Sequence, residues 1–490
     1  MAVSDRVGQR PWGRAAVWLA FLGLAFLGPF FFVTYLGSLE IVSWREQVPV
    51  LVFDRERHIP FLAWTIVPYW SIGLLYGLAL FLCTTRRELD RLGLRLASAQ
   101  AIAVAIFLVA PLNLTSTIPA EAGIFAPFFA GLEGIVGKSY NLAPSLHIAL
   151  LVILWAHYAR RIPARWRLPM HVWAALIGVS VLTVLQHHFF DVPTGAMLGF
   201  LCLWLWPEAG ANPVASARWT RDPKRWRIAG VYGLGALACL GLAVRIGGAA
   251  LWLLWPALSL LMVALAYAAI GAVLFQKDGG GRMSIGAKGL LWPYLMGARL
   301  NAWLWTRKLE ASVEITPGVR LGRVPAGQAG WSRVIDLTAE IPAPRGAVDW
   351  RALPMLDLVT PDPGELCEVA CRIEAGRREA RRQGGDLLVC CALGFSRSAA
   401  ALAVWLAVHG GAAHADEAIA ILRSRRPQIR LGTEMRSAIT AAIGRLRREG
   451  DFMRAVPGGS TGLYAAAASD SSSKVASALA PYISDGPPPI

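Results

Sequence analysis

The stretch VCCALGFSRSAA, Val389–Ala400, contains two adjacent cysteines, and an arginine follows six residues after the second one. The apolar run DLLVCC predicts a buried strand that ends at this point, and SAAALAVWLAV predicts a helix directly after it. Gly394 permits a tight turn with positive φ between them. Such a loop directs its backbone N–H groups and a helix N-terminus toward an anion, so the stretch predicts a phosphate-binding loop.

The predicted nucleophile of this loop is Cys391. Neighbouring side chains of a strand face opposite ways, so Cys390 is expected to lie outside the cavity of the loop. A positively polarised helix end favours the thiolate, which is the reactive form of cysteine. Arg397 can hold two phosphate oxygens with its planar guanidinium group, a geometry that lysine does not offer.

The sequence VCCALGFSRS resembles the loop of the dual-specificity phosphatases, which reads His-Cys-x5-Arg-Ser/Thr. This chain departs from the family pattern by having Cys390 in place of the histidine. The resemblance implies that Cys391 forms a phosphocysteine, that Arg397 binds phosphate and that Ser398 helps the thiolate to leave. It further implies that the loop residues contact phosphate, among them Gly394 and Ser396.

A general acid is also expected, because the leaving oxygen of a phosphomonoester needs a proton. The family supplies an aspartate from a loop some thirty residues upstream of the cysteine. In this chain the segment LPMLDLVTPDP offers Asp357, and Asp362 is its rival.

The residues before this region contain eight apolar runs, at 15–37, 59–83, 97–118, 145–160, 168–187, 192–207, 227–247 and 250–275. A helix that crosses a bilayer needs about 20 such residues. The composition, with 55% hydrophobic residues, agrees with a chain that is partly embedded in a membrane. Eight transmembrane helices are therefore expected.

Arginine and lysine account for the net charge of +16, and they gather in alternate loops between the apolar runs. The positive-inside rule then places both termini in the cytoplasm of a multi-pass protein in the inner membrane. Because the charge follows the pattern of a topology signal, no binding to nucleic acid is expected. The cysteines show no zinc-ligand spacing, so neither a metal nor another cofactor is expected.

Two polar motifs interrupt the apolar half, in NLAPSLHIALLVILW and SVLTVLQHHFFDVPTG. His187 and Asp191 are four residues apart, which on one helix face lets the carboxylate orient the imidazole. Ser145 and His147 belong to the other motif. The expected topology puts both motifs at the same membrane face, and ionisable side chains at such positions indicate function.

The pattern Pro-Ser-x-His followed by His-x3-Asp resembles the type 2 phosphatidic acid phosphatase superfamily, notably the branch similar to inositol phosphorylceramide synthases. The resemblance covers a six-helix core at about 59–207. It implies that His187 accepts the phosphoryl group and that Asp191 orients the His187 imidazole. It further implies that His147 protonates the leaving alcohol and that Ser145 contacts phosphate. The arginines that this superfamily uses are missing, which leaves Lys138 as the nearby cation. His188 is interpreted as an interfacial histidine.

The whole chain resembles bacterial membrane proteins in which such a core is fused to a dual-specificity phosphatase domain. The predicted fold is a polytopic α-helical membrane domain followed by a small cytosolic α/β domain. The expected boundaries are 1–276 for the membrane domain, 277–309 for a basic linker that starts with the flexible break KDGGGR, 310–450 for the α/β domain and 451–490 for a disordered tail.

The expected function is hydrolysis of phosphomonoesters, on phospholipid headgroups at the bilayer, by the cysteine site, with the histidine site on the opposite membrane face. One alternative is a lipid headgroup phosphotransferase that uses the histidine site. Another is a protein tyrosine or serine phosphatase whose membrane half is only an anchor.

Overall fold

A computed structural model describes residues 14–116, 122–136, 140–210, 212–325, 330–344, 346 and 349–455. The chain divides into two compact units. One, the helical unit, comprises Met1–Ala217, Gly235–Ser259 and Ser284–Trp292. The other, the α/β unit, comprises Arg218–Leu234, Leu260–Met283 and Pro293–Ile490. The α/β unit therefore includes parts of the apolar sequence, which the predicted boundary at 276 had assigned to the membrane domain.

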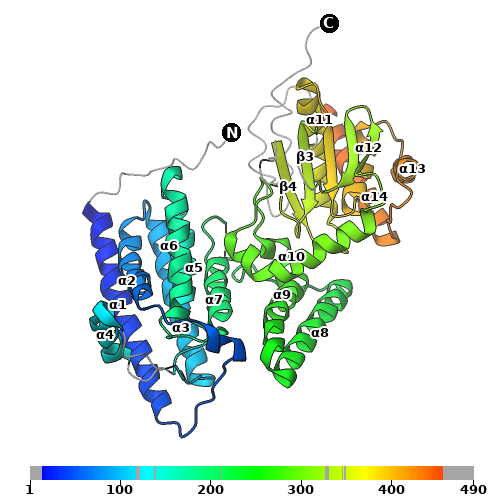
Figure 1. Cartoon of the computed structure of the whole chain (residues 1–490). Coiled ribbons are helices and arrows are strands. Elements are labelled where there is room, and N and C mark those ends of the chain that lie inside the picture. Colours follow the sequence, from blue (N-terminus) through cyan, green and yellow to red (C-terminus); the bar gives the residue numbers. More distant parts are fainter. Residues whose placement is uncertain are drawn as a thin grey trace. The chain divides into compact units, whose positions relative to one another are not determined.

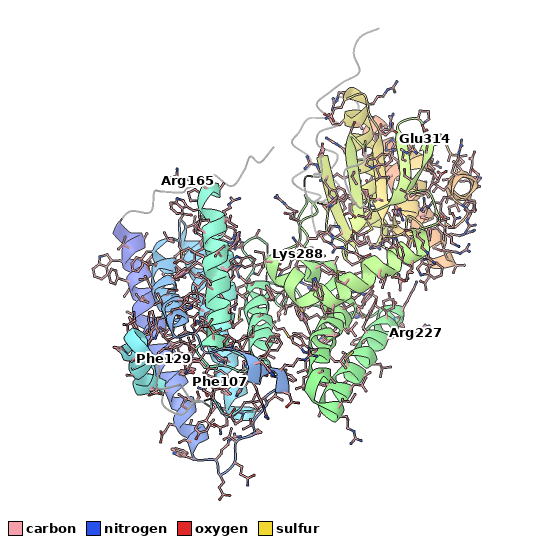
Figure 2. The ribbon with its side chains drawn as sticks, viewed as in Figure 1. Phe107, Phe129, Arg165, Arg227, Lys288 and Glu314 are labelled. Atoms are coloured by element: carbon pink, nitrogen blue, oxygen red, sulfur yellow. The ribbon has the colours of Figure 1, made fainter. Side chains whose placement is uncertain are left out.

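The apolar runs of the first 210 residues form helices, coloured blue to green in Figure 1. Their core lies among α1, α2, α3, α5 and α7, and Phe107, labelled in Figure 2, is fully buried in it. The helices are α1 (Arg14–Ser43), α2 (Ile66–Phe81), α3 (Arg86–Val109), α4 (Ala126–Val136), α5 (Leu146–Tyr158), α6 (Ala164–Thr183) and α7 (Asp191–Leu205).

Five helical segments in the described ranges are long and apolar enough to cross a membrane: Ala15–Ser43, Ala63–Phe81, Arg86–Val109, Pro223–Ile246 and Gly248–Phe275. Helices lie over all eight predicted ranges, but eight spans are not confirmed. The helices α5 and α7 have only 13 and 15 residues, which at a rise of about 1.5 Å per residue is shorter than a hydrocarbon core of about 30 Å. Helix α6 begins with the charged and proline-containing sequence ARWRLPMH, which lowers its hydropathy.

The later helices are α8 (Pro223–Ile246), α9 (Leu254–Leu265) and α10 (Ile285–Thr306). Between α9 and α10 the chain forms a π-helical turn, Ala266–Ile270, and a 3₁₀ turn, Gly271–Phe275. The segment KDGGGR, expected to be a flexible break, is instead part of an ordered hairpin, in which Lys277 and Met283 form an antiparallel bridge. Much of the segment expected to be a linker is the helix α10.

The α/β unit contains a five-stranded sheet in the order β1-β2-β5-β3-β4. Strand β1 is antiparallel to β2, and the other neighbours are parallel. The central strand β5 is buried along its whole length, as its apolar sequence predicts. The strands are β1 (Ser312–Thr316), β2 (Val319–Arg323), β3 (Arg333–Thr338), β4 (Asp349–Met355) and β5 (Leu387–Cys391).

One face of this sheet packs against four helices, α11 (Pro363–Arg382), α12 (Arg397–His409), α13 (Ala415–Arg425) and α14 (Thr433–Ala455). Cys391 belongs to the core on this face, whereas Cys390 belongs to a smaller cluster with Trp350 on the other face. The predicted alternation of the two cysteines is therefore confirmed. Of the predicted tail, residues 451–455 continue α14, and the remainder lies outside the described residues.

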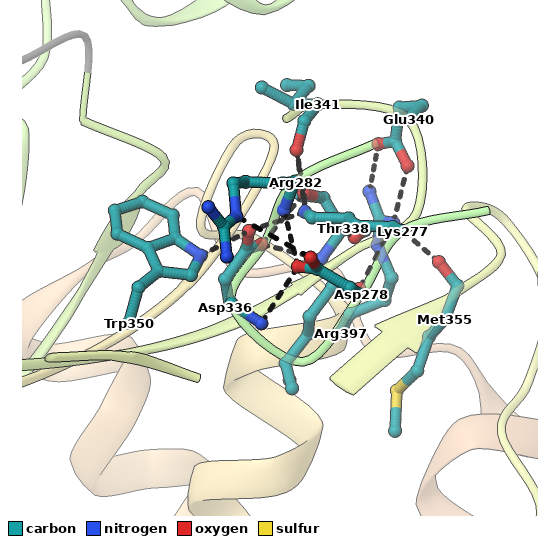
Figure 3. A network of polar contacts seen from close by, with 12 residues as sticks. Lys277, Asp278, Arg282, Asp336, Thr338, Glu340, Ile341, Trp350, Met355 and Arg397 are labelled. Atoms are coloured by element: carbon teal, nitrogen blue, oxygen red, sulfur yellow. Dashed lines mark hydrogen bonds and ion pairs between the residues drawn. The ribbon is translucent and has the colours of Figure 1, made fainter. Parts of the chain in front are cut away.

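The hairpin after the π-helical turn is attached to the sheet by a buried lysine (Figure 3). The side chain of Lys277 has no exposed surface, and its Nζ lies 2.5 Å from the Asp336 carboxylate on β3. The same ammonium donates to the carbonyl oxygens of Thr338 and Ile341, at 2.8 and 2.6 Å. The charges are thus paired and hydrogen-bonded, as a buried ion pair requires.

We expect Lys277→Met to lower the free energy of unfolding of the α/β unit by about 3–5 kcal/mol, because it leaves the Asp336 carboxylate buried without its cation. The matched control is Arg282→Met in the same hairpin. The Arg282 side chain is 81% exposed and 3.6 Å from Asp278, so its loss should change stability by less than about 0.5 kcal/mol. Thermal and denaturant unfolding of the full chain in detergent measures both. Equal effects of the two substitutions would contradict this interpretation.

Candidate active site

The loop after β5 brings the predicted nucleophile and its partners together. The Ser398 hydroxyl donates to the Cys391 sulfur at 3.2 Å, and a donor to sulfur stabilises the thiolate. Helix α12 begins at Arg397, so the positive end of the helix dipole lies next to the loop. Gly394 has φ +74°, and a Cβ there would lie 2.6 Å from the carbonyl oxygen of Gly322. Only glycine fits this turn, as its position in the sequence predicts.

The carbonyl groups of the loop are held by a neighbouring segment. Arg426 donates to the carbonyl oxygen of Leu393 at 3.0 Å, and the N–H of Arg430 donates to that of Phe395 at 3.0 Å. The Arg426 guanidinium also lies 5.2 Å from the centre of the Phe395 ring. Within the described residues, the N–H groups of 392–396 have no backbone acceptor, which leaves them free for an anion. Sequence reasoning missed Arg426.

Arg397 is 1% exposed and is fixed by Glu340, a residue that sequence reasoning also missed. Its Nη1 and Nη2 donate to the two carboxylate oxygens of Glu340, at 3.0 and 2.6 Å, and Nη1 also donates to the carbonyl oxygen of Met355 at 2.9 Å (Figure 3). The two parallel bonds fix the plane of the guanidinium. Among the described atoms, Arg397 Nε has no hydrogen-bond partner, which leaves a buried donor for phosphate.

The Arg397–Glu340 pair is ionised. Burial raises the pKa of Glu340, but the adjoining Arg397 guanidinium outweighs burial and holds that pKa below its usual value. Burial lowers the pKa of Arg397, whereas Glu340 and Asp357 together raise that pKa well above its usual range. The site therefore keeps a permanent cation beside the thiol. The only signal for Glu340 in the sequence was an acidic residue directly after the apolar stretch RVIDLTA, Arg333–Ala339.

The two candidate general acids have different surroundings. Asp357 follows β4, and its Oδ1 lies 3.2 Å from Arg397 Nη2, so its carboxyl group belongs to the site. Asp362 caps α11 instead, accepting a hydrogen bond from the N–H of Gly364 at 2.7 Å. Glu365 completes a capping box at the same helix end. The geometry thus favours Asp357 over its rival. Ser396 is the N-cap residue of α12.

Cys390 is fully buried on the opposite face of the sheet, and burial raises the pKa of its thiol well above the usual value. It therefore remains a neutral thiol among apolar side chains. Its position explains why the chain tolerates a cysteine there: the residue packs in a core and does not face the loop cavity.

A second constellation lies in the helical unit. The Ser145 hydroxyl is 3.1 Å from His187 Nε2, and His187 Nδ1 is 3.2 Å from the Asp191 carboxylate. The backbone N–H of Ser145 donates to the carbonyl oxygen of Asp191 at 3.1 Å, which ties the start of α5 to the start of α7. The structure thus brings together three residues that lie 46 positions apart at the extremes, as the two motifs predict.

His147 lies in the wall of a cavity in the helical unit, whose volume is about 400 Å³ and which is otherwise lined mainly by apolar side chains of α1, α2 and α5. Its ring stacks on Tyr69 with the ring centres 4.2 Å apart. His187 and Asn141 also line this cavity. Lys138, the cation expected here, lies outside the described residues.

His188 is more than an interfacial histidine. It is 4% exposed, its Nδ1 lies 3.2 Å from the Glu56 carboxylate, and its Nε2 lies 3.4 Å from the Thr115 hydroxyl. A second histidine–carboxylate pair therefore stands beside the predicted one. Sequence reasoning missed it because Glu56 is 132 residues away.

Comparison with known proteins finds similarity to solved structures over only part of the chain. No family model matches the sequence, and no curated protein matches it. Solved phosphatase structures are similar over less than a third of the chain. A mouse protein described as a dual specificity phosphatase is 25% identical over 29% of this chain and 91% of its own, with a TM-score of 0.26. Human DUSP28 is 26% identical over 28% and 99%, with a TM-score of 0.25. PTPMT1 in complex with PI(5)P is 17% identical over 29% and 99%, with a TM-score of 0.24.

We expect Glu340→Gln to reduce kcat/KM for phosphomonoesters about tenfold, because the neutral amide no longer fixes the Arg397 guanidinium with two charged bonds. The matched control is Glu314→Gln on β1, labelled in Figure 2, whose side chain is 53% exposed. Steady-state kinetics with 4-nitrophenyl phosphate measures both. If both variants keep the activity of the unsubstituted protein, Glu340 does not position Arg397.

Proposed function

We propose that the chain is a membrane-bound phosphatase that hydrolyses phosphomonoesters of phospholipid headgroups through Cys391. The observation that carries the proposal is the loop between Cys391 and Arg397, with the Ser398 hydroxyl 3.2 Å from the nucleophilic sulfur. The N–H groups of 392–396, the buried Arg397 guanidinium and the N-terminus of α12 would surround a bound phosphate dianion.

In the first step the Cys391 thiolate attacks phosphorus. The S–P bond forms while the bond from phosphorus to the ester oxygen breaks, and the electron pair leaves with that oxygen. Asp357 donates a proton to it, so an alcohol departs instead of an alkoxide. The product is a phosphocysteine, and the negative charge on the phosphoryl oxygens remains beside Arg397.

In the second step a water molecule attacks the phosphocysteine and transfers a proton to Asp357, which is now a carboxylate. The S–P bond breaks, and its electron pair returns to the Cys391 sulfur. The Ser398 hydroxyl stabilises the sulfur anion by donating to it. Inorganic phosphate is released, and the two steps need no cofactor.

Arg397 has two tasks in this scheme: it binds the phosphate, and it holds the Asp357 carboxyl group until the substrate arrives. Glu340 holds one side of its guanidinium, and the unpartnered Nε is available to phosphate. Before substrate binds, Asp357 lies 3.2 Å from Arg397 Nη2. A dianionic phosphate replaces this carboxyl group at the guanidinium, which frees Asp357 to reach the leaving oxygen.

The proposal of a lipid substrate is supported by the unit that carries the site. That unit includes 218–234 and 260–283, which contribute to two of the five apolar segments. The arginine clusters that predict cytoplasmic termini would place the site at the cytoplasmic face of the inner membrane. There it would meet headgroups without the lipid leaving the bilayer. Anionic lipid would be attracted by basic residues of the predicted linker, namely Arg282, Lys288, Arg299, Arg307 and Lys308.

The histidine site is a second candidate for phosphoryl transfer. The specific observation is the chain Ser145–His187–Asp191, with distances of 3.1 and 3.2 Å. The carboxylate fixes the tautomer that leaves His187 Nε2 nucleophilic. Transfer of a phospho-headgroup between lipids is the activity that this arrangement, beside an apolar cavity, favours.

The test is an assay of the full chain in detergent with short-chain phosphatidic acid, phosphatidylglycerophosphate, a phosphoinositide and a phosphotyrosine peptide. We expect phosphate release from the lipids, and Cys391→Ser should reduce it at least about 10³-fold because the nucleophile is lost. Cys390→Ser is the matched control, since this neighbouring thiol lies on the other face of the sheet. It should keep most of the activity.

The outcomes separate the alternatives. If Cys391→Ser is fully active and His187→Ala is inactive, the histidine site performs the reaction. Exchange of headgroups without free phosphate would identify a phosphotransferase. A strong preference for the phosphotyrosine peptide would make the protein a protein phosphatase with a membrane anchor.

A further inference from the structure

The loop that carries Asp357 is held by a residue of an apolar segment. The Tyr267 hydroxyl donates to the carbonyl oxygen of Asp357 at 3.1 Å. Tyr267 is 2% exposed and lies on the π-helical turn Ala266–Ile270. Such turns are rare and often occur at functional sites. Both residues belong to the α/β unit.

The backbone of the loop needs this support. Leu358, the residue after Asp357, has φ +59° and a side chain that is 62% exposed. A leucine in the left-handed region is strained. Because the Leu358 side chain is largely exposed, no burial of apolar surface offsets this strain. The peptide group between the two residues contains the carbonyl that Tyr267 binds. The hydroxyl therefore fixes the strained peptide next to the catalytic carboxyl group.

Tyr267 is itself held in place from two sides. Arg225 Nε donates to its carbonyl oxygen at 2.9 Å. The Tyr267 ring stacks on that of Tyr232 from α8, with centres 5.7 Å apart, and Tyr232 packs edge-on against Tyr294 of α10 at 5.8 Å. Because three helical segments determine the position of the ring, its hydroxyl is preorganised toward the loop.

The hairpin that follows the segment of Tyr267 holds the turn that carries Glu340. Lys277 donates to the carbonyl oxygens of Thr338 and Ile341, which flank Glu340 in the turn after β3 (Figure 3). Glu340 fixes Arg397. The segment from the π-helical turn to the hairpin thus holds both loops next to the Arg397 guanidinium. Tyr267 binds the loop of Asp357, and Lys277 binds the turn of Glu340.

We propose that the membrane-proximal segment 266–283 completes the catalytic centre, with Tyr267 as the positioning residue for the general acid Asp357 and Lys277 for the turn of Glu340. This inference rests on the proposed phosphatase activity. It implies that proton donation to the leaving group depends on the end of an apolar helical segment, so that the reaction is assembled at the membrane surface where a lipid headgroup lies.

The test uses two substrates that differ in their need for the acid. An alkoxide is a poor leaving group and needs the proton, whereas a 4-nitrophenolate departs without one. With the full chain in detergent, Tyr267→Phe should lower kcat/KM about tenfold for short-chain phosphatidic acid and less than about twofold for 4-nitrophenyl phosphate. In the Asp357→Asn background the same substitution should cost nothing further, because it acts through that carboxyl group.

The matched control is Tyr158→Phe, which removes a hydroxyl that donates to the carbonyl oxygen of Leu75 at 2.8 Å in the helical unit. It should leave the ratio of the two kcat/KM values unchanged. Two results would overturn the inference. One is a ratio of the two kcat/KM values that Tyr267→Phe leaves unchanged, and the other is a further loss from this substitution in the Asp357→Asn background. Failure of the proposed function itself is distinct: Cys391→Ser would then retain activity on both substrates.

Discussion

The buried ion pair between Arg397 and Glu340 is the interaction on which the rest of the site depends. A guanidinium that is 1% exposed would be costly without a carboxylate. With both Nη atoms held, the plane of the guanidinium is set before substrate arrives, and Nε remains available. Because Arg397 also begins α12, this pair fixes the helix whose N-terminus adjoins the loop after β5. Charge, orientation and backbone donors are thus coupled through one residue.

A second constraint follows from where Glu340 and Asp357 lie. Both belong to loops at the carboxyl ends of parallel strands, where α/β sheets bind ligands. Loops at such positions are variable and need external support. Here the support comes from Lys277 and Tyr267, which follow or belong to an apolar helical segment. The segment that would hold the protein to a membrane also shapes the proposed catalytic centre, which gives a physical reason for the two parts to occur in one chain.

The sequence predicted the parts of this arrangement that depend on local pattern. Strand alternation separated Cys391 from Cys390, and the requirement for positive φ identified Gly394. Long-range pairings left no such signal. Glu340 and Tyr267 meet their partners over 57 and 90 residues, so nothing in their neighbourhood indicates a role. The prediction of a flexible break in the hairpin at 277–283 was wrong because glycines suggest flexibility, whereas at Gly281 a Cβ would lie 2.5 Å from the Trp350 ring nitrogen. Eight spans are not confirmed, because five helical segments in the described part of the chain are long and apolar enough to cross a membrane.

In the proposed reaction, phosphate passes through a covalent bond to Cys391. The most direct measurement is rapid quenching of the full chain during turnover of short-chain phosphatidic acid, followed by mass spectrometry that locates the phosphoryl group. We expect a phosphocysteine at Cys391, and it should accumulate when Asp357→Asn turns over 4-nitrophenyl phosphate, because 4-nitrophenolate departs without a proton whereas hydrolysis of the intermediate has lost its base. A phosphoryl group found on His187, in an enzyme whose Cys391 stays unmodified during turnover, would contradict it.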